Sequence, residues 1–262
     1  MLLTISLPFM PLSALRRLAA SSLVIGVVTL AGCGTGLRHK YEYEEEIYLR
    51  LDGSATVNVN ASVPSLVALH GVDLPLDPKA RVDRARVRAL FHEPGWEAPR
   101  VSLSRRDGRR FVHASIEVPD VRQLPRLPIF SWSTYAFARR GDVFEYRQLV
   151  GASAGEPVGA VGWTGSELVV FKMHIPSEIP YHNTPSKRVE RGNIVQWEQQ
   201  LTDRLNGRTL DVQVNMEPES ILYATLILFG FTVLAVALTF AVVLWWIVRR
   251  GRESEEFPRP AL

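Results

Sequence analysis

The sequence predicts an α+β fold with a hairpin-rich antiparallel sheet, two or three helices and one C-terminal transmembrane helix. Three observations support this prediction. Several segments alternate apolar and polar residues with a period of two, which is typical of half-buried strands. Pairs such as Asp52-Gly53 and Asp107-Gly108 separate these segments and favour tight turns. The range 221–248 contains no charged residue. A pure β-sandwich is the alternative, because two of the expected helices are short.

Three hairpins are expected in the middle of the chain. They pair 41–51 with 54–63, 101–104 with 110–118, and 130–138 with 143–150. In the first strand the alternate residues Glu42, Glu44 and Glu46 are expected on the solvent-facing side, where they would protect a sheet edge. The third hairpin is expected to present one face made of Phe130, Trp132, Thr134, Ala136 and Ala138.

Helix signals lie between the hairpins. Ser62-Val63-Pro64 predicts the start of a short helix that ends at Gly71. Asp77-Pro78 predicts a longer helix that runs to about His92. The glycine-rich range 151–165 is expected to be a loop. Three more strands are expected at 168–175, 193–199 and 209–216, with a short helix between the last two.

Residues 1–32 have the pattern of a lipoprotein signal peptide. Arg16 and Arg17 precede an uncharged apolar stretch that ends in Leu30-Ala31-Gly32-Cys33. This ending matches the bacterial lipobox, in which the cysteine thiol receives a diacylglyceryl group and the chain is cut before it. The single cysteine, Cys33, is therefore the predicted lipidation site. The alternative is an uncleaved membrane anchor with an incidental cysteine.

The range 221–248 is long enough to span a bilayer as a helix. Tyr223 lies near one end, Trp245 and Trp246 lie near the other, and Arg249 and Arg250 follow at once, so these five are the predicted membrane-interface residues. The positive-inside rule places the tail 249–262 in the cytoplasm. Residues 33–220 are then an extracytoplasmic domain on the bacterial cytoplasmic membrane.

The formal net charge of +3 comes from the membrane flanks. Basic and acidic residues balance within 34–220, so the sequence gives no reason to expect a nucleic-acid partner. One basic feature remains, since Arg105, Arg106, Arg109 and Arg110 flank a hairpin turn. Such a cluster either grips a phosphate or is simply solvated, and the second interpretation is the more common.

No local motif predicts catalysis, a metal or a cofactor. No two of the six histidines lie three or four residues apart, and the chain has no GxSxG sequence. His174, Glu178 and His182 form a possible triad by spacing alone. Pro176 and Pro180 break any helix that would align them. We therefore expect no enzyme, no metal site and no cofactor.

Several features together resemble the LppM-type bacterial lipoproteins. They are the lipobox, Asp52-Gly53-Ser54-Ala55 after a strand rich in Tyr and Glu, Gly95-Trp96, the run from Ile175-Pro176 to Trp197, and the C-terminal helix followed by arginines. The resemblance implies a surface-exposed α/β domain similar to lipid-binding grip folds, with no established catalysis. It assigns no functional residue to this chain.

The function expected from these features is that of a membrane-anchored, non-enzymatic binding module for a lipid or amphiphile. The alternative is an envelope assembly or structural factor that binds another membrane protein, through the face with Phe130 and Trp132 or through the transmembrane helix. A hydrolase that uses His174, Glu178 or His182 is a third hypothesis.

Overall fold

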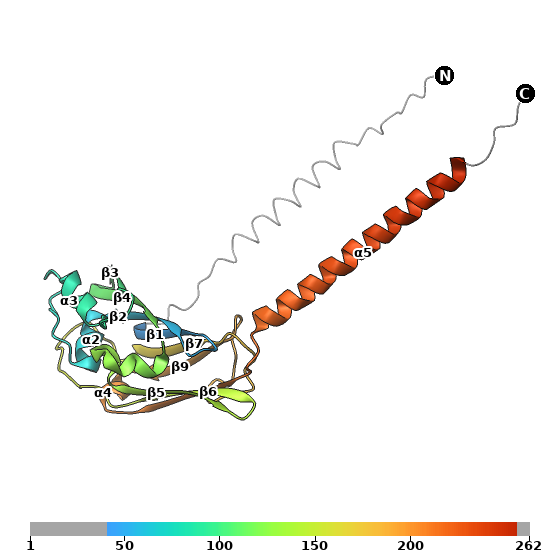
Figure 1. The fold of residues 1–262 in the computed structure, drawn as a ribbon. Coiled ribbons are helices and arrows are strands. Elements are labelled where there is room, and N and C mark those ends of the chain that lie inside the picture. The colour runs from blue at the N-terminus through green and yellow to red at the C-terminus, as the bar shows by residue number, and fades with distance from the viewer. Residues whose placement is uncertain (1–40, 256–262) are drawn as a thin grey trace, which may run out of the picture. The chain divides into compact units, whose positions relative to one another are not determined.

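A computed structural model of the chain describes residues 41–255 (Figure 1). The predicted signal peptide 1–32, the predicted lipidation site Cys33 and the end of the tail, 256–262, lie outside the described residues. The residues before α5 form two sheets, short helices and connecting loops, and one long helix follows them. The predicted α+β class is thus confirmed, with two sheets in place of one.

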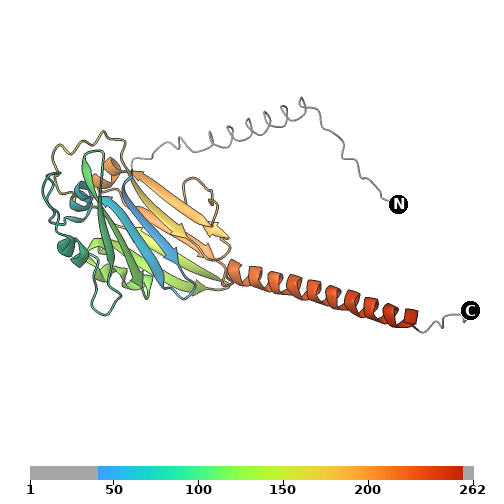
Figure 2. The same cartoon turned by 90° about the horizontal axis from the view of Figure 1, so that it is seen from above.

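The larger sheet has six strands in the order β3-β4-β2-β1-β7-β9, and the smaller sheet has four in the order β5-β6-β10-β8 (Figure 2). Strands pair antiparallel except β1 and β7, which run parallel. The strand bounds are β1 Tyr41–Leu49, β2 Ala55–Ser62, β3 Arg100–Arg106, β4 Arg109–Val118, β5 Ser133–Arg140, β6 Val143–Val150, β7 Leu168–His174, β8 Tyr181–His182, β9 Ile194–Gln200 and β10 Leu210–Met216.

The helices are short apart from the last one. Their bounds are α2 Val63–His70, α3 Arg84–Ala89, η1 Val121–Arg126, η2 Pro128–Phe130, α4 Leu201–Leu205 and α5 Ile221–Glu255, where η denotes a 3-10 helix. The predicted caps of α2 are confirmed: the Ser62 hydroxyl accepts from the Ser65 N–H, and Gly71 ends the helix in the left-handed conformation.

The predicted helix from Asp77 to about His92 is wrong in extent. The Asp77 carboxylate accepts the Lys79 N–H, and the Asp77 carbonyl accepts the Ala80 N–H, so this segment closes a turn. The helix begins only after Asp83, whose side chain accepts the Ala85 N–H. Both Asp77 and Asp83 are good capping residues, and the structure uses the second as the cap.

The predicted solvent-facing edge in β1 is also wrong. β1 lies between β2 and β7, and Glu42 is buried. Glu44 and Glu46 do face outward, but they are paired with Lys172 and His174 of β7. The sequence pattern of one strand cannot show which strand lies next to it, and here β7 joins from far along the chain.

The predicted apolar face of the third hairpin has the wrong phase. The buried residues of β5 are Ser133, Tyr135 and Phe137. The 3-10 turn η2 precedes the strand, so the alternation begins at Ser133, and Thr134, Ala136 and Ala138 of the predicted face turn outward. Phe130 itself is fully buried, which removes it as a docking residue for a protein partner.

The glycine-rich loop is tied to the end of α2. The N–H groups of Ala154, Gly155 and Glu156 donate to carbonyls of Leu69 and Ala68. The last carbonyls of a helix have no partner within the helix, so this loop satisfies them. The loop then leads to Glu167, whose side chain accepts the N–H groups of Thr164 and Gly165.

The two sheets share one core, and a buried carboxyl group of the larger sheet is hydrogen-bonded to residues of the smaller one. Glu45 of β1 accepts hydrogen bonds from Tyr43, from Tyr135 of β5 at 3.2 Å and from Gln148 of β6 at 2.9 Å. Burial raises the pKa of Glu45 to about 7, although these hydrogen bonds and Arg204 oppose the shift. Close by, burial lowers the pKa of His70 to about 3, so its ring is neutral at physiological pH.

Candidate functional site

A pocket of about 250 Å³ lies where β1 and β7 begin. Four chain segments form it: the first turn of α2, the segment that follows α2, the β3–β4 turn, and the loop before β7. Its lining residues are Val63, Pro64, Pro75, Leu76, Asp77, Pro78, Asp107, Gly108, Arg109, Arg110, Ala160, Val161 and Gly162. Three prolines and the aliphatic side chains make most of the wall apolar.

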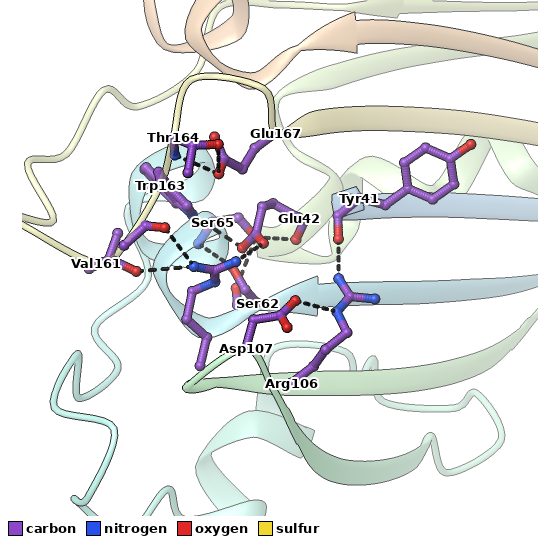
Figure 3. A network of polar contacts seen from close by, with 12 residues as sticks. Tyr41, Glu42, Ser62, Ser65, Arg106, Asp107, Val161, Trp163, Thr164 and Glu167 are labelled. Carbon is purple, nitrogen blue, oxygen red and sulfur yellow. Dashed lines mark hydrogen bonds and ion pairs between the residues drawn. The ribbon is translucent and has the colours of Figure 1, made fainter. Parts of the chain in front are cut away.

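A buried ion pair forms one side of this pocket (Figure 3). Arg109 Nη2 donates to Glu42 Oε1 at 2.8 Å, and the two side chains are only 9% and 1% exposed. Arg109 Nη1 donates to the carbonyls of Val161 and Gly162 at 3.3 and 3.1 Å. The second carboxylate oxygen of Glu42 accepts the Trp163 indole N–H at 3.2 Å. The pair therefore fastens the loop before β7 to the larger sheet.

The β3–β4 turn places Arg109 at the pocket. Asp107 and Gly108 both have positive φ angles, 51° and 74°, as a two-residue hairpin turn requires. The predicted Asp-Gly turn is confirmed. Because Arg109 is the first residue after the turn, its side chain points inward toward Glu42 while its neighbour Arg110 reaches toward the segment after α2.

The arginines of this turn bind the protein's own backbone. Arg105 and Arg110 both donate to the Pro78 carbonyl, at 3.1 and 2.9 Å. Arg106 donates to the Tyr41 carbonyl at 2.5 Å and lies over the Phe111 ring. Neither sequence interpretation, a phosphate grip or a solvated tip, describes this arrangement. The four arginines hold the pocket walls together.

The charges at the pocket cancel. Arg109 is paired with Glu42, and Asp107 with Arg106 at 3.8 Å, which leaves Asp77 and Arg110 with opposite charges among the lining residues. Burying a further charged group here would leave that group without a counter-charge, which costs several kcal/mol. The pocket is therefore suited to an uncharged, largely apolar group.

The structure does not assemble the triad suggested by spacing. His174 Nε2 lies 2.7 Å from Glu46 Oε1, and the His174 ring stacks on Tyr48 with ring centroids 3.9 Å apart. His182 lies on β8 in the other sheet and contacts the Thr184 hydroxyl. Glu178 lies on the exposed connection between these strands. Within residues 41–255, no three His, Cys, Asp or Glu side chains form a group that could hold a metal ion.

The five predicted membrane-interface residues all lie on α5. The range Ile221–Arg250 includes an 18-residue window with a mean hydropathy of 2.7 and no buried residue, so it is long and apolar enough to cross a membrane. The Arg249 and Arg250 guanidinium groups lie over the rings of Trp245 and Trp246, at 5.4 and 4.7 Å from the ring centroids. Tyr223, near the other end, is 63% exposed.

Sequence reasoning missed Glu42 and Arg109 as partners. Their separation of 67 residues leaves no local pattern that would pair them. The only available signal was the position of Arg109 directly after a tight turn, where side-chain direction is fixed.

Comparison with solved structures gives a distant likeness. The folded domain of Mycobacterium tuberculosis LppM, solved by NMR, is similar to this chain with 15% identity and a TM-score of 0.40, over 71% of this chain and 95% of that one. A TM-score this low carries no argument about function. The expected resemblance to LppM-type lipoproteins is thus supported only as a distant structural likeness. No family model matches the chain, and no curated protein matches it.

Proposed function

We propose that this chain is a membrane-anchored extracytoplasmic lipoprotein whose domain binds the apolar part of an amphiphile. The pocket beside Arg109 would hold this ligand without catalysing a reaction on it. The observation that carries the proposal is the pocket beside Arg109. Its walls are mostly apolar, its charges cancel, and no serine, threonine, cysteine, lysine or histidine is among its lining residues. Such a site gains free energy from burying apolar surface and offers little to a charged ligand.

The pocket volume limits the ligand. A water-sized group occupies about 30 Å³, so 250 Å³ holds roughly eight of them. This is the size of a short acyl segment, or of the end of a longer chain. A whole phospholipid exceeds it, so the rest of the amphiphile would remain outside the pocket.

The position of the pocket fits a ligand that comes from the envelope. Ser220, directly before α5, bridges to Ser177 beyond the end of β7, whereas the pocket lies where β7 begins. Cys33 precedes Tyr41 by a short segment that spans up to about 28 Å when extended. A lipid attached at Cys33 would therefore hold the pocket end of the domain within that distance of the outer leaflet.

Photolabelling tests the proposal on the full chain in phospholipid vesicles. The probe is a monoacylglycerol with an eight-carbon chain that carries a diazirine. We expect adducts on the segments 75–78 and 160–162. Leu76→Arg places a charge in the pocket and should abolish labelling there.

The matched control is Leu149→Arg, which changes an exposed leucine of β6 in the other sheet. It should label like the unaltered chain. Adducts spread evenly over the domain, or unchanged in Leu76→Arg, would contradict the proposed binding site.

The second candidate function is to bind another envelope protein, and α5 is the surface that would make this contact. Every described side chain of its apolar span is exposed, so a partner helix would find a free surface there. The other surface suggested for such a partner is lost, since Phe130 is buried. Cross-linking in membranes that yields one stoichiometric protein partner, with no lipid adduct in the pocket, would favour this function.

A further inference from the structure

A chain of hydrogen bonds crosses five adjacent strands on the outer face of the larger sheet. Ser104 Oγ of β3 lies 2.7 Å from His113 Nε2 of β4, and His113 Nδ1 lies 2.8 Å from Asn60 Oδ1 of β2. Asn60 Nδ2 then donates to Glu44 of β1 at 3.1 Å, and Glu44 accepts from Lys172 of β7 at 2.5 Å. These residues come from separate parts of the sequence, so no local motif announces them.

The pair of Lys172 and Glu44, at one end of this series of hydrogen bonds, determines where the protons lie at the other end. Lys172 keeps Glu44 as an acceptor, so the Asn60 amide nitrogen must face Glu44 and its oxygen must face His113. Because that oxygen only accepts, His113 Nδ1 carries the proton. His113 Nε2 is then bare and accepts the Ser104 hydroxyl proton. This is the tautomer that a general base requires.

His113 is held in its neutral form. Partial burial and the nearby charge of Arg106 lower the pKa of His113, although Glu44 opposes the shift. A neutral imidazole with its Nε2 lone pair directed at a serine hydroxyl is the arrangement that activates a serine. Ser104 itself is exposed, so a substrate can reach it.

A groove adjoins the serine on the same face. It has a volume of about 250 Å³, and its lining includes His113, Ser102, Val101 and the exposed guanidinium of Arg100. β3 is an edge strand. In a two-residue hairpin the residues that flank the turn, here Arg106 and Arg109, exchange backbone hydrogen bonds. The backbone groups of successive residues point alternately toward and away from the partner strand, so the N–H of Arg105, next to Ser104, points toward the open edge of the sheet. That N–H is a donor for the oxygen of an attacked carbonyl.

We propose that Ser104, His113 and Asn60 form a nucleophilic site for acyl esters, separate from the ligand pocket, with Ser104 as nucleophile, His113 as general base and Asn60 as positioning residue. Ser104 Oγ bonds to the ester carbonyl carbon while its proton moves to His113 Nε2. The carbon–oxygen bond to the alcohol breaks, and the alcohol leaves with that proton. Water then releases the acid from the acyl-serine by the same steps in reverse. Arg100 favours esters that carry a negative charge on the acyl part.

The proposal departs from the expectation of no enzyme, which rested on local motifs, and it is independent of the amphiphile pocket. The test uses the full chain in detergent micelles with a fluorophosphonate probe, which forms a covalent bond to activated serines only. We expect one adduct per chain, located on Ser104 by peptide mass spectrometry. Ser104→Ala should remove it, and His113→Ala should slow it at least 100-fold.

Further variants separate positioning from folding. Ser186→Ala changes an exposed serine outside this groove, in the loop after β8, and should label at the unaltered rate. Asn60→Ala should slow labelling, and Asn60→Asp combined with Glu44→Gln, which keeps an acceptor toward His113 and gives the new carboxylate an amide donor in place of Glu44, should restore most of it. The proposal is overturned if the probe leaves Ser104 unmodified in the folded chain. It is also overturned if His113→Ala, folded by circular dichroism, labels as fast as the unaltered chain.

Discussion

Replacing Glu45 by Gln should remove a large pH-dependent contribution to the stability of the domain. The Glu45 pKa rises from 4.5 to about 7 on folding because the carboxyl group is buried between the sheets. Between these pH values the folded chain holds a proton that the unfolded chain releases. The contribution of Glu45 to the free energy of unfolding therefore falls as pH rises from 4.5 to 7, and it is level above 7. His70, whose pKa is lowered by burial, contributes a slope of the opposite sign between pH 3 and 6.5, so the effect of Glu45 is read from the difference between the variant and the unaltered chain.

The size of this effect follows from the shift. A difference of about 2.5 pKa units corresponds to about 3 kcal/mol at 1.36 kcal/mol per unit. Gln keeps an acceptor toward Tyr135 and Gln148 and has no charge to bury. We expect Glu45→Gln to abolish this slope and to be the more stable form at pH 8, by up to about 3 kcal/mol.

Thermal unfolding of the full chain in micelles, followed by near-ultraviolet circular dichroism from pH 4 to 8, measures this difference. The control is Glu117→Gln, which removes the same charge from the outer face of the same sheet, where Glu117 pairs with Arg50. It should leave the slope in place. If the difference in stability between Glu45→Gln and the unaltered chain does not change from pH 4.5 to 7, or if the variant is the less stable form at pH 8, the carboxylate is ionised and stabilised in the core, and the reasoning is refuted.

Three other outcomes are expected. Arg109→Met should destabilise the domain by about 3–5 kcal/mol, because it leaves Glu42 buried without its counter-charge. Adding Glu42→Gln should recover part of this loss in thermal unfolding, and losses of stability that simply add in the double variant would contradict the pairing. Gly151→Ala should cost about 1–3 kcal/mol, since the new Cβ would lie 2.8 Å from the Trp132 carbonyl oxygen, and an unchanged melting temperature would refute the close approach. Cys33→Ala should end incorporation of labelled palmitate but leave the chain in the membrane fraction, because the predicted span remains; retained label would rule out Cys33 as the lipidation site.

Local signals in the sequence were sufficient for much of the fold. The caps of α2 and the Asp-Gly turns depend on residues within a few positions of each other, and the structure has them where they were expected. The long apolar run predicts α5 for the same reason. In contrast, the phase of β5 depends on the 3-10 turn before it, and one extra turn residue exchanges its two faces.

The candidate sites could not be predicted because their residues meet only through sheet topology. Glu42 has the same spacing as Glu44 and Glu46, yet it alone lies at the end of β1 where Arg109 reaches inward. His113 and Asn60 come together because β4 pairs with β2 in one register. If one of these strands slipped by one residue, the two side chains would lie on opposite faces of the sheet.

The central claim is that the pocket beside Arg109 holds the apolar part of an amphiphile. Native mass spectrometry of the full chain, released from lipid nanodiscs, tests this claim most directly. The account predicts one retained amphiphile per chain, which is lost in Leu76→Arg and kept in Leu149→Arg. A spectrum with no retained amphiphile, or with the same occupancy in Leu76→Arg, would contradict it.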